Sequence, residues 1–296
     1  MRRREFIVLV GMTAASWSFA ARAQQPKPVA KIGFLYPGPE PVAKLRSVPL
    51  LAGLASEGLH EPKDFVLITR ATGGDMAKVP PLLDELLASK VDLLAISGPT
   101  LTRAVHEAIK TLPIVTIDLE SDLVESGWLQ SYARPGGNLT GVFSDFPDFS
   151  AKWLQLLREI VPGITKLVVL WDPSTPRVQQ KAVTAAAQLI NVKTEVLELR
   201  SPSDFDAASA RRPDGLLLLS FPLVSINSKR LAELTLQHRL PAISMFANFA
   251  RAGGLISYGP NLDEFYVRPA FWRPRSSKAP NPLTCLPNFQ HASNLL

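Results

Sequence analysis

The stretch ISGPT at residues 96–100 combines two hydroxyl side chains with a Gly-Pro turn. The apolar run before it predicts a strand and the pattern after it predicts a helix, so Ser97, Gly98 and Thr100 should stand at a helix N-terminus. Free backbone N–H groups and hydroxyls at such a position can receive a carboxylate. Thr100 could equally cap its own helix, a role that uses the same geometry. We therefore predict ligand contacts from Ser97, Gly98 and Thr100.

Three aspartates follow other predicted strands. Asp118 comes after the run LPIVTI, Asp145 after NLTGVFS and Asp172 after TKLVVLW. Loops at the carboxyl ends of parallel strands face the ligand cleft in α/β folds, and a carboxylate there could take an ammonium group. Asp172 could instead begin a turn before Pro173, and Asp145 could be a solvated loop residue. Each aspartate is therefore a candidate, with a plain turn or loop role as the alternative.

Four aromatic residues stand beside the same strand ends. Tyr36 follows the first predicted strand, Phe221 follows the eighth, and Phe246 and Tyr258 flank a later break in the pattern. They could supply apolar walls or stacking faces for a ligand, although each could equally belong to the core.

These residues must be positioned by the elements that alternate along the chain. Short apolar runs alternate with helical patterns such as DMAKVPPLLDELLASK and SAKWLQLLREIV, which predicts an α/β fold with parallel sheets. The ten runs are KIGFLYP, DFVLITRA, VDLLAISG, LPIVTIDL, NLTGVFSD, TKLVVLWDP, KTEVLELR, DGLLLLSFP, LPAISMFA and GGLISYGP. Ten strands are many for one sheet, so two lobes are expected.

Two breaks in the alternation mark the expected crossings between the lobes. At residues 133–145 and again at 245–259, strands follow each other without a full helix between them. We predict one lobe from residues 30–140 with about 250–266, and a second lobe from 145–245. The glycine pairs at 136–137 and 253–254 could form a hinge, or could be plain turn glycines. A ligand would bind between the lobes.

Composition and charge exclude several function classes. The net charge is +6 over 296 residues. Residues 1–23 carry about +3 and the segment after Tyr266 about +4, so the body between them is near −1. Such a body has no broad cationic face for phosphates, and we expect no nucleic-acid partner. The sequence lacks the G-x-S-x-G, Walker, zinc-helix and G-x-G-x-x-G motifs, which argues against an enzyme, a cofactor or a metal.

The first 23 residues have the pattern of a cleaved export signal. An arginine cluster at residues 2–4 precedes an apolar run, and the sequence Ala21-Arg22-Ala23 forms a small-x-small cleavage site. The two arginines before Glu5 also fit the twin-arginine pattern, with general secretion as the alternative. Cleavage before Gln24 would leave a mature protein in the periplasm.

Several motifs together resemble a known family. The segments ARAQQ, IGFL, SGPT, LPIVTID, RPGGNLTGV and AGGLISYGPN look like those of the tryptophan/tyrosine-type substrate-binding proteins of ABC importers. The resemblance runs from residue 1 to about Tyr266. It implies a type I periplasmic binding protein, with two Rossmann-like lobes joined by a hinge. It further implies a small-molecule ligand, for which an aromatic amino acid is a candidate, an ABC permease as partner in the inner membrane, and no catalysis.

Three alternatives stay open at this stage: a periplasmic flavodoxin-like enzyme, a ligand-sensing domain and a degenerate copy of the binding protein. The third arises because residues 267–296 lack any apolar period. In the neighbouring reading frame, Pro274–Leu286 permits KILKGAKPADLP, a continuation typical of the resembling family. We therefore expect a frameshifted tail and an incomplete C-terminal part of the fold.

Overall fold

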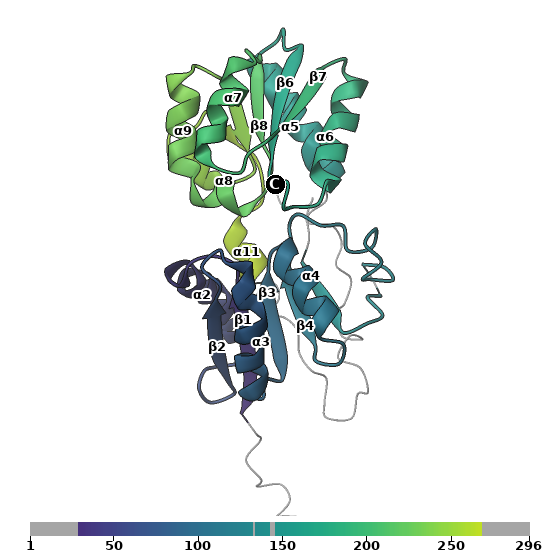
Figure 1. Ribbon diagram of the computed structural model, residues 1–296, viewed down its shortest axis with the longest axis vertical. Coiled ribbons are helices and arrows are strands. Elements are labelled where there is room, and N and C mark those ends of the chain that lie inside the picture. The colour runs from purple at the N-terminus through teal and green to yellow at the C-terminus, as the bar shows by residue number, and fades with distance from the viewer. Residues whose placement is uncertain (1–28, 133, 143–145, 268–296) are drawn as a thin grey trace, which may run out of the picture.

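The computed structural model describes residues 29–132, 134–142 and 146–267. It has two α/β lobes, each with a five-stranded parallel sheet, stacked along the long axis of the molecule (Figure 1). The predicted α/β class with two lobes and parallel sheets is confirmed. All ten apolar runs form strands.

The first lobe is a sheet in the order β2-β1-β3-β4-β5 with helices on both faces. Side chains of adjacent residues in β1 point to opposite faces, so Phe34 packs with α2 and α11 whereas Leu35 packs with α3 and α4. The elements are β1 (Ala30–Tyr36), α2 (Glu40–Ser56), β2 (Phe65–Ala71), α3 (Val79–Ala88), β3 (Leu93–Ser97), α4 (Pro99–Ala108), β4 (Ile114–Ile117) and β5 (Leu139–Val142), with α11 (Leu262–Val267) returning to this lobe.

The second lobe has a sheet in the order β10-β9-β8-β6-β7. One continuous core joins both faces of this sheet to its helices, with Trp153, Phe205, Phe221 and Phe249 fully buried. The elements are α5 (Phe146–Ile160), β6 (Lys166–Trp171), α6 (Val178–Leu189), β7 (Lys193–Glu198), α7 (Phe205–Ala210), β8 (Gly215–Leu218), α8 (Pro222–Ile226), α9 (Ser228–Gln237), β9 (Ala242–Ser244), α10 (Ala247–Arg251) and β10 (Ile256–Ser257).

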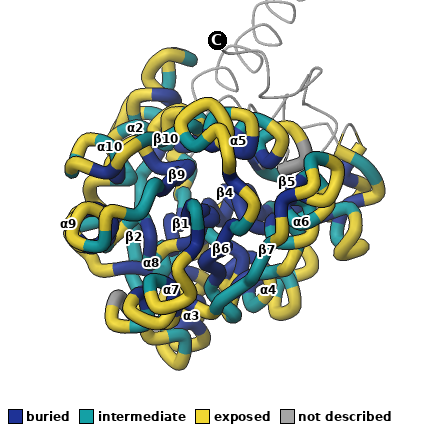
Figure 2. The backbone as a smooth tube through the Cα atoms, turned by 90° about the horizontal axis from the view of Figure 1, so that it is seen from above, coloured by how far each residue is buried: buried dark blue, intermediate teal, exposed yellow. Residues whose placement is uncertain are grey.

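The central strands are mostly apolar because helices cover them on both sides. Every residue of β3, β4 and β8 is buried, whereas the edge strand β7 has no buried residue. Figure 2 shows the same arrangement from above, with buried strands in the middle and exposed helix faces around them. This covering explains why the sequence shows continuous apolar runs rather than strict alternation.

The return to the first lobe is later than we predicted. We placed residues from about 250 in the first lobe, but β10 pairs with β9 in the second sheet, with Ile256 opposite Ile243. The chain turns after α10 at Gly253, whose φ of +99° suits glycine, and so lays β10 beside β9. The Trp153 Nε1–H donates to the Tyr258 carbonyl at 2.6 Å and holds the next segment on the second lobe. Only α11 crosses back, to pack on α2.

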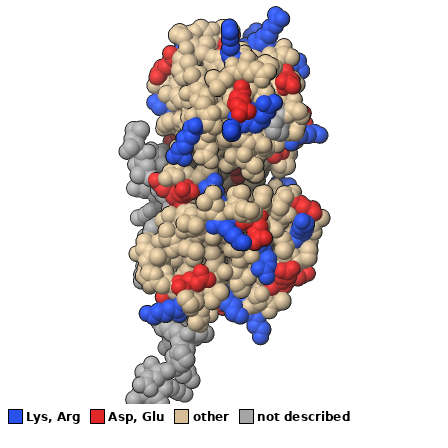
Figure 3. Space-filling view, turned by 90° about the vertical axis from the view of Figure 1, so that its left-hand side faces the viewer, with Lys and Arg blue, Asp and Glu red and all other residues tan. Residues whose placement is uncertain are grey.

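The predicted export signal, residues 1–23, and residues 268–296 of the predicted frameshifted tail lie outside the described residues. None of the helices that can be described is long and apolar enough to cross a membrane. Acidic and basic side chains alternate over both lobes on the face in Figure 3, and the molecule narrows between the lobes.

Candidate functional site

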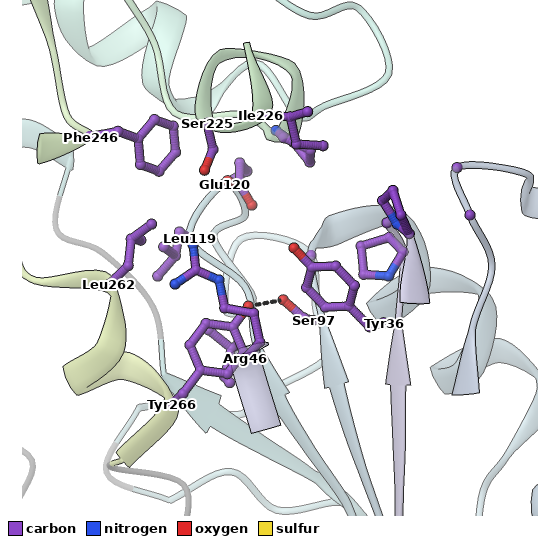
Figure 4. Close-up of a pocket in the computed structure, with 18 residues that line it drawn as sticks. Tyr36, Arg46, Ser97, Leu119, Glu120, Ser225, Ile226, Phe246, Leu262 and Tyr266 are labelled. Carbon is purple, nitrogen blue, oxygen red and sulfur yellow. Dashed lines mark hydrogen bonds between the residues drawn. The ribbon is translucent and has the colours of Figure 1, made fainter. Parts of the chain in front are cut away.

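A pocket of about 310 Å³ lies where the two lobes meet. The first lobe lines it with the loops after β1, β2, β3 and β4, all at the carboxyl edge of its sheet. The second lobe contributes both ends of the short helix α8 and the residue before α10, and α11 closes one side (Figure 4). Both lobes therefore contact whatever occupies this space, as expected at the carboxyl ends of parallel strands.

The turn after β3 brings backbone to the pocket wall. Gly98 is the N-cap of α4 with φ of +84°, and Pro99 follows it in the first turn of the helix. An L side chain is strained at this φ, so glycine is the residue that lets β3 turn sharply into α4. As a result Ser97 and Gly98 line the pocket.

Arg46 places a positive charge in the pocket. It extends from α2, and its guanidinium carbon lies 5.4 Å from the centre of the Tyr266 ring. The Nη1 atom of Arg46 also pairs with an Asp263 carboxylate oxygen at 3.0 Å. The Arg46 side chain is mostly buried, at 13% exposed, so its charge is only weakly screened by water. It is well suited to receive a ligand carboxylate.

Aromatic side chains form walls around this charge. Tyr36 and Tyr266 come from the first lobe side and Phe246 from the second lobe, with Leu119 and Leu262 between them (Figure 4). Burial raises the pKa of Tyr36, although the adjacent Arg46 guanidinium opposes this shift. Burial likewise raises the pKa of Tyr266, so both hydroxyls stay protonated near neutral pH. The pocket is an apolar, aromatic space with a few polar groups.

One hydrogen bond joins α11 to the first sheet inside the pocket. The Ser97 Oγ and the Tyr266 hydroxyl lie 2.9 Å apart, and either can donate. Both residues are buried, with 7% and 5% of their surface exposed. This contact links the last described helix to the end of β3.

Two buried carboxyl groups lie in the loop after β4. The Asp118 Oδ1 accepts the backbone N–H groups of Glu120 at 3.1 Å and Ser121 at 2.9 Å, which fixes the loop. Glu120 lines the pocket and accepts a hydrogen bond from the Ser220 Oγ of the second lobe at 2.9 Å. Burial raises the pKa of Asp118. Burial, and then the charge of Asp118, raise the pKa of Glu120 to about 8.

The predicted ligand contacts divide into three groups. Four of them line the pocket: Tyr36, Ser97, Gly98 and Phe246. Five others lie in the described residues but not among the lining residues: Thr100, Asp118, Asp172, Phe221 and Tyr258. Asp145 lies outside the described residues.

Local structure explains why those five are elsewhere. Thr100 is exposed on α4, and the helix cap is Gly98 instead. The Asp118 Oδ1 accepts backbone N–H groups of its own loop, and Asp172 accepts the Ser174 N–H at 2.8 Å in the predicted turn. Phe221 is fully buried in the core, and Tyr258 packs against Phe149.

Sequence reasoning missed Arg46, Glu120 and Tyr266. Glu120 is two residues beyond Asp118, so the sequence analysis selected the correct loop but the wrong acidic residue. Arg46 lies inside a helix, where no motif signals a ligand contact. The sequence analysis used Tyr266 only to mark the end of the regular helix and strand pattern.

Among the described residues, no cluster of three or more histidine, cysteine or acidic side chains could hold a metal ion. The arrangement offers a guanidinium, a carboxyl group, hydroxyls and aromatic walls within a single small space. Such a set can bind an organic molecule that has an apolar body and polar ends.

A family model described as "ABC transporter substrate binding protein" matches residues 43–270, and the chain belongs to this family. The resemblance seen in the sequence is thereby confirmed. A tyrosine-binding protein of Clostridioides difficile is 23% identical over 227 residues, which are 72% of this chain and 63% of that protein. The chain thus spans less than two thirds of that relative's length.

Two solved structures share the fold. A conserved domain protein from Vibrio cholerae has a TM-score of 0.73 at 20% identity, covering 82% of this chain and 83% of that one. An ABC domain from Streptococcus pneumonia in complex with L-Trp also has a TM-score of 0.73, at 19% identity, covering 82% of both chains.

Proposed function

We propose that this protein is the exported solute-binding component of an ABC importer and that it binds an aromatic amino acid in the inter-lobe pocket. The observation that carries the proposal is the pocket itself, which both lobes line and which joins aromatic walls to a buried guanidinium. Family membership supports the importer role. The ligands in the relatives' names, tyrosine and L-Trp, support the ligand class.

The size and the walls of the pocket fit this class of ligand. A volume of about 310 Å³ is near the lower end for small-molecule sites, which suits a single amino acid better than a larger solute. Tyr36, Tyr266 and Phe246 can contact a ring from several sides, and pairs of aromatic rings favour edge or offset contacts. The Arg46 guanidinium would take the carboxylate end.

We further propose binding without turnover. Ser97 is the pocket serine whose hydroxyl lies at a helix N-terminus, but its partner is the Tyr266 hydroxyl and not a base. A nucleophilic serine needs an adjacent general base within hydrogen-bond reach. The aromatic, hydrogen-bonded setting is instead typical of a recognition site.

Export and the permease partner complete the proposal. The pattern of residues 1–23 supports a periplasmic protein, and the family description supports delivery to an inner-membrane permease. Hinged closure of two lobes on a ligand would provide the change in shape that a permease can recognise.

Mass spectrometry of small molecules retained by protein purified from the periplasm tests the ligand class. It should find an aromatic amino acid, and calorimetric titration with L-tryptophan and L-tyrosine should give saturable binding. L-alanine is the control, because it has the same ammonium and carboxylate groups but no ring for the aromatic walls. A protein that retains a different solute and shows no heat with either aromatic amino acid would refute the ligand assignment.

A further inference from the structure

Glu120 is the pocket carboxyl group that both lobes hold. It follows β4 of the first lobe, and its Oε1 accepts the Ser220 hydroxyl of the second lobe at 2.9 Å. In Figure 4 its side chain lies between Ser225 and Ile226 on one side and Leu119 on the other. The residue is 5% exposed. A ligand in this pocket therefore lies beside a buried acid that is itself part of the contact between the lobes.

Ser220 is held firmly by its own lobe. The Gln179 Nε2–H donates to the Ser220 carbonyl at 2.6 Å, and the Ser220 N–H donates to the Gln179 Oε1 at 2.7 Å. Gln179 is fully buried in α6. This pair of bonds fixes the Ser220 backbone, so that its hydroxyl can meet Glu120 only when the two lobes are close together.

We propose that Glu120 recognises the ammonium group of the ligand by giving up its own proton, and that Ser220 joins this event to closure of the lobes. The inference rests on the proposed amino-acid ligand and adds the residue that distinguishes an amino acid from a simple carboxylic acid. The step balances as R–NH₃⁺ plus Glu–COOH giving the ion pair R–NH₃⁺···⁻OOC–Glu plus one H⁺ released to solvent.

The groups around Glu120 explain why it should hold a proton before the ligand arrives. Asp118 in the same loop and Asp172 at the end of β6 both raise its pKa by their charge, after burial. Tyr36 and Tyr266 line the same pocket and stay neutral, and Arg46 is the pocket cation. The Ser220 hydrogen bond favours the charged form but does not outweigh burial.

An ammonium group changes this balance. A cation in contact with Glu120 favours the carboxylate, because an opposite charge within about 4–6 Å lowers the pKa of an acid. Arg46 contacts Asp263 through its Nη1, and the other N–H donors of the guanidinium can take the opposite, anionic end of the ligand. A ligand that has a carboxylate but no ammonium would leave Glu120 protonated. The pocket should therefore prefer a zwitterion, with Arg46 of α2 binding the carboxylate and Glu120 of the β4 loop binding the ammonium group.

This preference can be measured with two probes that differ only at the α-carbon. L-tryptophan has the ammonium group and indole-3-propionate lacks it. Titration calorimetry in buffers of different ionisation enthalpy should show release of about one proton per L-tryptophan near pH 6.5, and none with indole-3-propionate. The Kd for L-tryptophan should fall roughly 50-fold from pH 6 to pH 8, as expected for an acid whose pKa is near 8 in the free protein.

Three variants separate the parts of the inference. Glu120→Gln keeps an acceptor for Ser220 but cannot ionise, so it should lose the proton release and at least about tenfold of the preference for L-tryptophan over indole-3-propionate. Ser220→Ala should weaken both probes while proton release with L-tryptophan persists, and Ser220→Thr should restore binding. Glu125→Gln is the matched control, because Glu125 makes an exposed ion pair between the lobes, with Lys181 at 3.3 Å, outside the pocket.

The outcomes distinguish the two proposals. Binding of L-tryptophan without proton release, and with the same preference in Glu120→Gln as in the wild type, would overturn the role of Glu120 and leave the ligand class standing. Failure of wild-type protein to bind both L-tryptophan and L-tyrosine across pH 6–8 would overturn the ligand class and the ammonium role together.

Discussion

The hydrogen bond between Ser97 and Tyr266 gives a direct test of how α11 is attached to the first lobe. Tyr266→Phe removes the hydroxyl but keeps the ring, which meets Phe34 edge-on at 6.4 Å and lies under Arg46. Ser97→Ala removes the other hydroxyl at the end of β3. A coupling between the two variants in the free energy of unfolding would therefore report the 2.9 Å contact between the hydroxyls and not lost packing.

The magnitude follows from burial. Leaving a buried hydroxyl without its partner costs about 1–3 kcal/mol, and both groups also line the pocket, where water can replace part of the loss. We expect each single variant to lower the free energy of unfolding by about 1 kcal/mol. The double variant should cost less than the sum of the two, with a coupling energy of about 1 kcal/mol.

Urea unfolding followed by circular dichroism measures these differences through the midpoint, provided that the slope is unchanged. Tyr132→Phe is the control. It removes an exposed hydroxyl that donates to Asp122 at 2.6 Å and is not part of this contact. Strict additivity of Ser97→Ala and Tyr266→Phe would show that the hydroxyls are not coupled, and would refute the attachment of α11 through this bond.

Further predictions concern the charges and the two ends of the chain. Arg46→Met should weaken L-tryptophan binding at least about tenfold, because the carboxylate of the bound ligand loses its partner. The control Arg70→Met, which breaks an ion pair with Glu85 outside the pocket, should leave the affinity unchanged. Equal affinities of Arg46→Met and the wild type would exclude Arg46 from the site. The pKa of Glu120 is raised from 4.5 to about 8 in the native state, so between these pH values the native state holds a proton that the unfolded state has released. The free energy of unfolding should therefore fall with rising pH across that window, by up to about 1.4 kcal/mol per pH unit. Glu120→Gln should flatten this slope in urea titrations. N-terminal sequencing of exported protein should begin at Gln24, and a different start would contradict the cleavage site. Translation of the neighbouring reading frame after Tyr266 should give a strand and helices typical of the family, and a frame without them would refute the frameshift.

The sequence alone determined the fold class because covered parallel strands leave a strong local signal. The stretches LLAI in β3 and LVVLW in β6 are apolar throughout, since both of their faces are buried, and this pattern is visible without knowledge of any partner strand. It also indicated the loops at the strand ends where a site should lie. Tyr36, Ser97, Gly98 and Phe246, which line the pocket, were selected in this way, each by its position at or near the end of an apolar run.

Only the tertiary structure decided which side chains enter the pocket. Asp118 and Glu120 are two residues apart in one loop, but the first is bound to backbone N–H groups and the second reaches across to Ser220, 100 positions along the chain. Arg46 joins the site from within a helix because α2 and α11 pack together. The short strand β10 is placed by pairing with β9, which no local pattern encodes. Contacts between distant segments depend on how the whole chain packs, whereas strand and helix patterns depend on neighbours in sequence.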